Sequence, residues 1–274
     1  MSQTPQLQLH AGAATHVGRV REHNEDHAVA RGTVFVVADG MGGHAAGEVA
    51  SKLAADTLAE LAEREELTRE DVVDQLTLAN TRILQAAEAN PAQRGMGTTA
   101  TGLALVAAGG SDHWLVFNIG DSRVYRLRAG LLSQVTNDHS EVRELLDLGL
   151  ITADEARIHP GRHVVTRSLG FEPMAPPDTW MLPTDPGERF VLCSDGVFGE
   201  LDDTQLQSLL LAHPEAQEAA DALVRAAVEA GGRDNATAIV VGLEERVEGS
   251  EADPDTAPRT RDLEREPTPE GSGE

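Results

Sequence analysis

Six short apolar runs, each long enough for one β-strand, constrain the fold of this chain more than any other feature. They are rich in Val, Ile and Phe, as strands prefer, and they lie at 33–39, 101–107, 113–121, 123–127, 189–195 and 236–243. The run 113–121 passes into 123–127 through a turn that is too short for a crossover helix. Connections of this length join antiparallel strands, so we predict antiparallel pairing rather than a regular alternation of parallel strands and helices.

Three stretches with helical periodicity separate these runs, at 45–65, 68–90 and 214–232. Aromatic residues make up only 3% of the chain, so the core must consist of Ala, Val and Leu packed between sheets and helices. We therefore predict an α+β fold in which helices lie on the faces of the sheets.

The body of the chain shows no internal repeat and no low-complexity linker, and we predict one folded domain at 6–243. From residue 244 onward the sequence consists mainly of Glu, Asp, Pro, Gly, Ser and Arg without an apolar period. Such a segment cannot bury enough apolar surface to offset its ordering entropy. We expect 244–274 to be an acidic, disordered tail that aids solubility.

The charge balance is strongly acidic, because 22 Lys and Arg residues stand against 46 Asp and Glu residues, a net charge of −24. A field of this sign repels nucleic acid and anionic membranes, so we expect neither as a partner. No apolar stretch approaches the roughly 18 residues of a membrane span. The first ten residues lack the basic start and apolar centre of a signal peptide. With a single cysteine, these features favour a cytoplasmic protein.

Aspartates stand where the predicted strands end or begin. Asp39, Asp121 and Asp195 each close an apolar run, and Asp234 comes just before another. One such residue is ordinarily a turn residue, but four carboxylates near one sheet edge would repel one another, and the chain contains a single Lys. Divalent cations are the natural compensation, and carboxylate oxygens select Mg²⁺ or Mn²⁺.

Seven short motifs occur around these aspartates. They are RVREHNED (19–26), ADGMGGHAAGEVAS (38–51), GMGTTATG (95–102), NIGDSRVY (118–125), TNDHSEV (136–142), LCSDGVF (192–198) and GGRDNATAIV (231–240). In this order they resemble the metal-dependent protein serine/threonine phosphatase family, type 2C, particularly its bacterial members. The resemblance covers about residues 14 to 241. It implies a central antiparallel β-sandwich flanked by helices on both faces, with a metal cluster at one end.

The resemblance also implies which residues bind the metals. Asp39 resembles the carboxylate that bridges two metals, and the Gly40 carbonyl resembles a ligand to one of them. Asp195 and Asp234 resemble the remaining direct ligands. Two or three Mn²⁺ or Mg²⁺ ions per chain are then expected, and a pair of such ions can activate a water molecule against a phosphate ester.

Other acids in these motifs resemble supporting groups of the same site. Glu25 is similar to an acid that holds a metal-bound water, and Asp26 to one that supports the site from behind the ligands. Asp121 is similar to an aspartate of a third, weaker metal site. The segment 138–170, which carries two short helical patterns, corresponds to a flap beside the catalytic cleft, and it is longer than an ordinary connection.

Arg21 and His44 are the candidates for catalysis. By resemblance, Arg21 grips the phosphoryl oxygens, a task that suits a planar guanidinium, and His44 protonates the leaving oxygen. The eukaryotic pattern has a His directly after the metal-binding Gly, where this chain has Met41, so the choice of His44 follows the DGMGGH arrangement of bacterial relatives. We interpret His23, His27 and His139 as structural residues.

The leading hypothesis is a monomeric, Mn²⁺- or Mg²⁺-dependent phosphatase that acts on phosphorylated proteins and opposes a bacterial Ser/Thr kinase. An alternative is a catalytically inactive regulatory protein that keeps the fold and binds phosphoproteins. The intact set of Asp39, Asp195, Asp234 and Arg21 argues against it. A metal-dependent nuclease conflicts with the acidic charge. A cysteine phosphatase is excluded because Gly199, not an Arg, stands six residues beyond Cys193.

Overall fold

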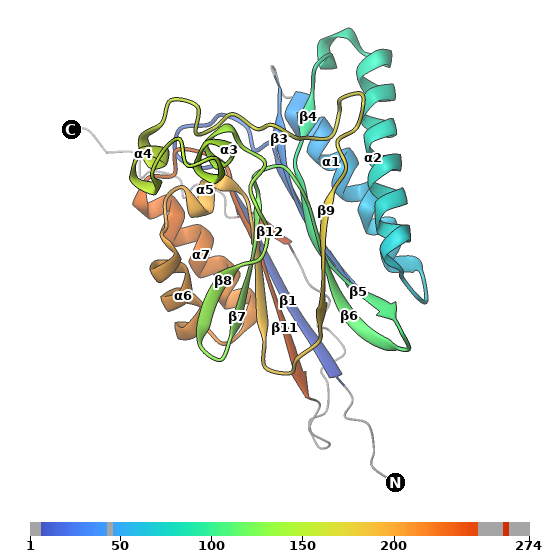
Figure 1. The fold of residues 1–274 in the computed structure, drawn as a ribbon, viewed down its shortest axis with the longest axis vertical. Coiled ribbons are helices and arrows are strands. Elements are labelled where there is room, and N and C mark those ends of the chain that lie inside the picture. The colour runs from blue at the N-terminus through green and yellow to red at the C-terminus, as the bar shows by residue number, and fades with distance from the viewer. Residues whose placement is uncertain (1–6, 43–45, 246–259, 263–274) are drawn as a thin grey trace, which may run out of the picture.

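A computed structural model describes residues 7–42, 46–245 and 260–262 and shows two β-sheets packed face to face with helices on the two outer faces (Figure 1). The first sheet has the strand order β12-β1-β11-β10-β7-β8. Its strands are β1 (Leu7–His16), β7 (Arg123–Arg128), β8 (Leu131–Gln134), β10 (Arg189–Cys193), β11 (Ala236–Glu245) and β12 (Thr260–Asp262). All of its pairs are antiparallel except the pair β1–β12.

The second sheet has the order β2-β3-β5-β6-β9, with the short β4 paired to β3, and all its pairs are antiparallel. Its strands are β2 (Asp26–Arg31), β3 (Val34–Met41), β4 (Gly97–Thr98), β5 (Ala100–Ala108), β6 (Ser111–Ile119) and β9 (Asp178–Pro183). All six predicted strand runs are strands, and the predicted antiparallel pairing is confirmed.

Helices cover the outer face of each sheet, as the predicted helix–sheet–sheet–helix layering requires. On the second sheet lie α1 (Ala46–Ala59), which continues as a 3₁₀ turn over Glu60–Glu63, and α2 (Arg69–Ala89), which a 3₁₀ turn over Pro91–Gln93 follows. On the first sheet lie α6 (Asp203–Ala212) and α7 (Ala216–Ala230). A capping box between Thr68 and Asp71 starts α2.

The core consists of three apolar layers. Ala and Leu side chains of α1 and α2 pack on the second sheet, and those of α6 and α7 pack on the first. Between the sheets, Trp114 meets Phe190 edge to face with ring centroids 5.5 Å apart. The small helix residues allow close packing. The aromatic residues are divided: Phe35, Trp114, Trp180 and Phe190 pack between the sheets, and Phe117 and Tyr125 pack under the helices.

Within the segment predicted as a flap, 138–170, the chain forms α3 (Glu141–Asp147) and α4 (Ala153–Ile158), which lie beside one end of the sandwich (Figure 1). A capping box of Thr152 and Glu155 starts α4. Isolated bridges fix the segment near both ends, between Ser140 and Val165 and between Leu169 and Thr98 of β4.

The acidic tail predicted at 244–274 is only partly described by the structure. The strand β11 continues to Glu245, two residues beyond the predicted domain end, and Thr260–Asp262 forms β12, which differs from the predicted lack of structure at these residues. Backbone pairing with the free edge of β1 requires no apolar pattern, which is why the sequence carried no signal for it. The remainder, 246–259 and 263–274, lies outside the described residues. None of the helices in the described ranges combines the length and apolarity that a membrane crossing demands.

Candidate metal centre

The predicted carboxylates come together because the strand directions bring their ends to one end of the sandwich. Asp39 lies at the end of β3, and its cross-strand partner Asp26 opens the antiparallel β2. Asp121 follows the end of β6, and Asp195 begins the short helix α5 (Asp195–Phe198) after β10. Asp234 precedes β11, which starts where the antiparallel β10 ends.

Hydrogen bonds from β4 and β5 fix the backbone of Asp39. Its N–H donates to Thr99 Oγ1 (2.9 Å), and its carbonyl accepts from the Thr99 N–H and from Thr98 Oγ1 (2.9 Å each). Thr99 Oγ1 is also hydrogen-bonded to Ser122 Oγ (2.9 Å), next to Asp121. One threonine therefore links the backbone that carries Asp39 to the loop that carries Asp121.

Gly40 stands where the chain passes between α1 and the loop that contains Glu25. A Cβ at this position would lie 2.2 Å from the Gly47 carbonyl oxygen and 2.6 Å from the Glu25 carbonyl oxygen. The Gly40 N–H donates to the Glu25 oxygen (3.1 Å). Only glycine allows this close approach, so packing explains why Gly40 follows Asp39.

Asn235 organises the loop 17–25 and was not predicted from the sequence. Its Oδ1 accepts from the Glu25 N–H (2.8 Å), and its Nδ2 donates to the carbonyl oxygens of Val17 and His23 (2.9 Å each). A side-chain amide both donates and accepts, which suits a residue that closes a loop onto a strand end. The only sequence signal was its place directly after Asp234.

Burial and mutual repulsion perturb the carboxylates. Burial, reinforced by the charges of Asp26 and Asp195, raises the pKa of Asp39 well above its usual range. Burial raises the pKa of Asp26 to about 7, although the hydroxyl of Ser194 acts in the opposite direction. Burial, with the charge of Asp195 next, also raises the pKa of Asp121 to about 7. The protein thus places several acids where their negative charges are poorly compensated.

Asp26 shows most directly that a positive group is missing from the protein's own contacts. Its Oδ2 accepts a hydrogen bond from Ser194 Oγ (2.7 Å), but its buried Oδ1 has no hydrogen-bond partner. An unsatisfied buried carboxylate oxygen is costly. The hard oxygen donors around it suit Mg²⁺ or Mn²⁺, so the residues present fit a divalent cation.

Two cationic side chains contact the predicted ligands. Arg21 Nη2 donates to Asp234 Oδ2 (2.7 Å), at the exposed edge of the cluster. His163, from the flap, places Nδ1 3.7 Å from Asp195 Oδ2, and this nearby carboxylate raises the pKa of the imidazole. His163 was missed by the sequence reasoning, because no local pattern shows that the flap folds back onto α5.

The carboxylates are near one another without forming a closed coordination set. Across the described ranges, no three His, Cys, Asp or Glu side chains are arranged to hold one ion as they stand. Asp234 pairs with Arg21, and Asp195 pairs with His163. Both pairings are consistent with carboxylates that do not converge on one point. Glu25 lies at the same end, and burial raises its pKa, which the charge of Arg21 opposes.

Two other predicted residues have different outcomes. His44 lies outside the described residues, so its role as proton donor stays a prediction. Cys193 is fully buried in the core, and burial raises the pKa of its thiol to about 12. A thiol in this environment is not ionised at neutral pH and is no nucleophile.

Comparisons with known proteins agree with this geometry. The sequence profile of the family described as Protein phosphatase 2C matches residues 19–226. The serine/threonine phosphatase stp of Listeria monocytogenes is 36% identical over 260 residues, which cover 89% of this chain and 100% of the relative.

Solved structures are also similar. The serine/threonine phosphatase PstP/Ppp of Mycobacterium tuberculosis has a TM-score of 0.80 at 39% identity, covering 86% of this chain and 99% of that one. The catalytic domain of PstP in complex with two manganese ions has a TM-score of 0.79 at 36% identity, covering 88% and 100%.

Proposed function

We propose, from the premise that this chain belongs to the protein phosphatase 2C family and is a protein phosphatase, that it hydrolyses phosphoserine and phosphothreonine in phosphorylated proteins with two or three Mn²⁺ or Mg²⁺ ions. The observation that carries the metal dependence is the cluster of buried carboxylates, in which Asp26 Oδ1 has no partner and the pKa values of Asp26 and Asp121 are raised to about 7. The manganese ions in the PstP complex support the choice of metal.

In this proposal each acid has a separate task. Asp39, Asp195 and Asp234 bind the cations directly, and the Gly40 carbonyl supplies a further oxygen. Glu25 acts through a water molecule. Asp26, fixed by Ser194, supports the site from behind, and Asp121 serves a third, weaker position.

Bound cations would supply the charge that lowers the pKa of a water molecule and offsets negative charge on the phosphoryl group. Arg21 is the group of this chain that would bind the substrate: half of its side chain is exposed, and it pairs with Asp234, a carboxylate that would hold a cation. Its planar guanidinium could bind two phosphoryl oxygens at once. His44 protonates the leaving oxygen of serine or threonine.

The wider setting follows from the substrate. Phosphoserine and phosphothreonine in proteins are made by Ser/Thr kinases, so we propose that this enzyme reverses the action of such a kinase in the cytoplasm. We further propose that 6–243 is the catalytic domain, with 138–170 as its flap, that 244–274 is dispensable for turnover, and that the enzyme is a monomer.

The test uses the full chain, freed of metal and assayed on p-nitrophenyl phosphate and on phosphoserine and phosphothreonine peptides. We expect turnover with Mn²⁺ or Mg²⁺, none in EDTA, and a loss of roughly 10²-fold or more with Asp39→Asn. The matched control is Asp112→Asn, an exposed aspartate at the opposite end of β6, which should match the wild type. Equal turnover in EDTA and in Mn²⁺ would refute the metal dependence.

A further inference from the structure

His139 is a buried histidine to which the proposed reaction gives no task. Only 5% of the residue is exposed, and it lies at the start of the flap, outside the carboxylate cluster. Burial lowers the pKa of its imidazole, and Asp178 opposes this shift. The ring is therefore neutral at neutral pH, with one nitrogen as donor and the other as acceptor.

On one side, His139 holds the residue before Asp121. The His139 N–H donates to the Gly120 carbonyl (2.9 Å), and the Gly120 N–H donates to His139 Nδ1 (3.0 Å). Gly120 has φ of +117°, and a Cβ there would lie 2.5 Å from Thr99 Cγ2. Both polar groups of Gly120 are thus bonded to one residue, which fixes the direction in which the chain enters Asp121.

On the other side, His139 contacts the returning end of the flap. Because Nδ1 accepts, the ring hydrogen is on Nε2, which donates to Asp178 Oδ2 (3.2 Å) at the start of β9. Arg167 Nη1 lies 3.3 Å from the same Nε2, which cannot accept from it while it carries the hydrogen. Arg167 Nη1 donates to Asp178 Oδ1 (3.1 Å), and the Thr166 N–H donates to the His139 carbonyl (2.8 Å). Through its ring and its backbone carbonyl, His139 therefore links the Gly120–Asp121 peptide to the start of β9 and to the returning end of the flap.

We propose that His139 is a positioning residue that couples the flap to the aspartate of the third, weaker metal position. Nδ1 fixes the orientation of the Gly120–Asp121 peptide. Nε2 fixes the position of Asp178, and with it the ion pair between Asp178 and Arg167 at the end of the flap. A shift of the flap then changes the orientation of Asp121. The metal side of this inference rests on the proposed function, whereas the coupling itself is a property of the protein alone.

Two conservative substitutions separate the two halves of the ring. His139→Asn places an amide oxygen near the position of Nδ1, so it keeps an acceptor for the Gly120 N–H but does not reach Asp178. His139→Gln places an amide N–H₂ near the position of Nε2, so it keeps the donor to Asp178 but loses the acceptor. The matched control is His113→Gln, at the opposite end of β6.

Hydrogen–deuterium exchange of the metal-free protein measures the coupling without any metal. We expect His139→Gln to speed exchange of the Gly120 amide roughly tenfold or more, with the flap amides unchanged. His139→Asn should leave the Gly120 amide protected. It keeps the carbonyl that accepts from the Thr166 N–H, but Asp178 and Arg167 lose the ring beside them, so exchange at the Thr166 amide should speed up as this end of the flap loosens. His113→Gln should alter neither.

Calorimetric titration with Mn²⁺ and steady-state kinetics on a phosphopeptide then test the link to the site. We expect His139→Gln to weaken the weakest Mn²⁺ binding step by roughly 10-fold to 100-fold, as loss of a group that orients a ligand does. His139→Asn should mainly raise KM for the phosphopeptide. Asp178→Asn, at a partly exposed position, should behave as His139→Asn and serves as the second variant if either His139 variant does not fold.

The inference is overturned if His139→Asn and His139→Gln give the same exchange pattern, or if both loosen the whole domain uniformly, since a merely structural histidine would do so. It is also overturned if Asp178→Asn affects the Gly120 amide but not the flap. A wild-type protein without metal-dependent turnover would refute the proposed function and leave the exchange result to decide the coupling.

Discussion

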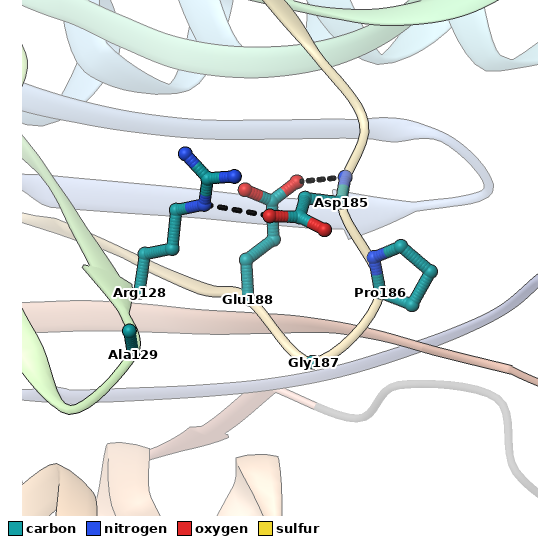
Figure 2. A pocket seen from close by; sticks show the side chains of 6 residues that line it. All are labelled: Arg128, Ala129, Asp185, Pro186, Gly187 and Glu188. Atoms are coloured by element: carbon teal, nitrogen blue, oxygen red, sulfur yellow. Dashed lines mark hydrogen bonds and ion pairs between the residues drawn. The ribbon is translucent and has the colours of Figure 1, made fainter.

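The two ends of the β-sandwich both bury carboxylates, but they compensate them differently. At the end opposite the metal centre, Glu188 has a side chain with no exposed area. Its Oε1 accepts from Trp114 Nε1 (2.8 Å) and from the Asp185 N–H (2.9 Å), and its Oε2 accepts from Arg126 Nε (2.6 Å). Arg128 pairs with Asp185 beside it. Arg128, Asp185 and Glu188 are among the residues that line a surface pocket (Figure 2).

At the metal centre, by contrast, Asp26 Oδ1 has no partner, and neighbouring acids help to raise the pKa of Asp39. The difference shows which buried acids are structural. The charge of Glu188 is satisfied within the chain, so the pocket of Figure 2 has no unpaired acid to offer a ligand. The charges of the cluster are not satisfied within the chain, which supports the proposal that the functional site lies at this poorly compensated end.

The largest expected effect is the loss of activity on removing a ligand from the cluster. Asp39→Asn and Asp195→Asn should each lower kcat/KM on a phosphopeptide by roughly 10²-fold to 10³-fold or more, because charge stabilisation at the phosphoryl group is lost. In EDTA the same variants should melt at or above the wild-type temperature, since a repulsive charge is gone. If these variants instead lost much of their stability and kept their activity, the carboxylate cluster would be structural, and the comparison between the two ends would be wrong.

Glu188→Ala should have the opposite profile. It leaves the buried guanidinium of Arg126 without its partner, which costs roughly 3–5 kcal/mol of unfolding free energy. Activity per folded molecule should be unchanged in urea-free buffer. Urea denaturation measures the loss, and the matched control is Asp185→Asn, whose ion pair with Arg128 is exposed and is worth about 1 kcal/mol or less. Equal costs for the two variants would contradict a structural role for Glu188.

Manganese should stabilise the cluster end specifically. At 100 times its dissociation constant, Mn²⁺ should add about 2.7 kcal/mol to the unfolding free energy. Asp39→Asn should remove most of this gain, whereas Asp185→Asn should keep it. Thermal melts in EDTA and in Mn²⁺ measure the difference, and an unchanged gain in Asp39→Asn would show that the metal stabilises the protein elsewhere.

The pH dependence of the metal-free protein should have a defined sign. Asp26 and Asp121 have pKa values of about 7 in the folded protein, against 3.8 for an ordinary aspartate. Between these values the folded state binds more protons than the unfolded state, so stability should fall as pH rises from about 4 to 7. Saturating Mn²⁺ should flatten this slope. Melting curves that rise across this window in EDTA would contradict the raised pKa values.

The contrast also shows what the sequence could reveal. Strands such as β3 and β10 were predictable because their apolar runs end sharply in Asp39 and Asp195. β1 was not, because in its Ala-rich segment Thr15 is the single β-branched residue of the kind that strands prefer. Its ten residues become a strand by pairing along β11, where Ala13 faces the inter-sheet core and Ala14 faces the helices. Long-range pairing with β11 therefore decides that this segment forms a strand.

For the metal centre, a local motif was enough to nominate the acids but not their partners. Each predicted aspartate sits in a strand-end motif, which is local. The contacts of His163 with Asp195, and of His139 with Gly120, depend on how the flap returns across the molecule. No spacing rule in the sequence encodes that return, so these residues became visible only in three dimensions.

The smallest expected effect comes from Cys193→Ser, two residues from Asp195 but on the core side of β10. The thiol packs with Tyr125 and Val197 in the apolar layer under the helices, and its raised pKa of about 12 keeps it neutral. A hydroxyl in its place should cost about 1–3 kcal/mol of stability and leave kcat/KM of the folded enzyme within about twofold of wild type. Kinetics at a temperature where both proteins are folded test this. A tenfold loss would mean that the core behind Asp195, and not only its carboxylate, sets the geometry of the cluster.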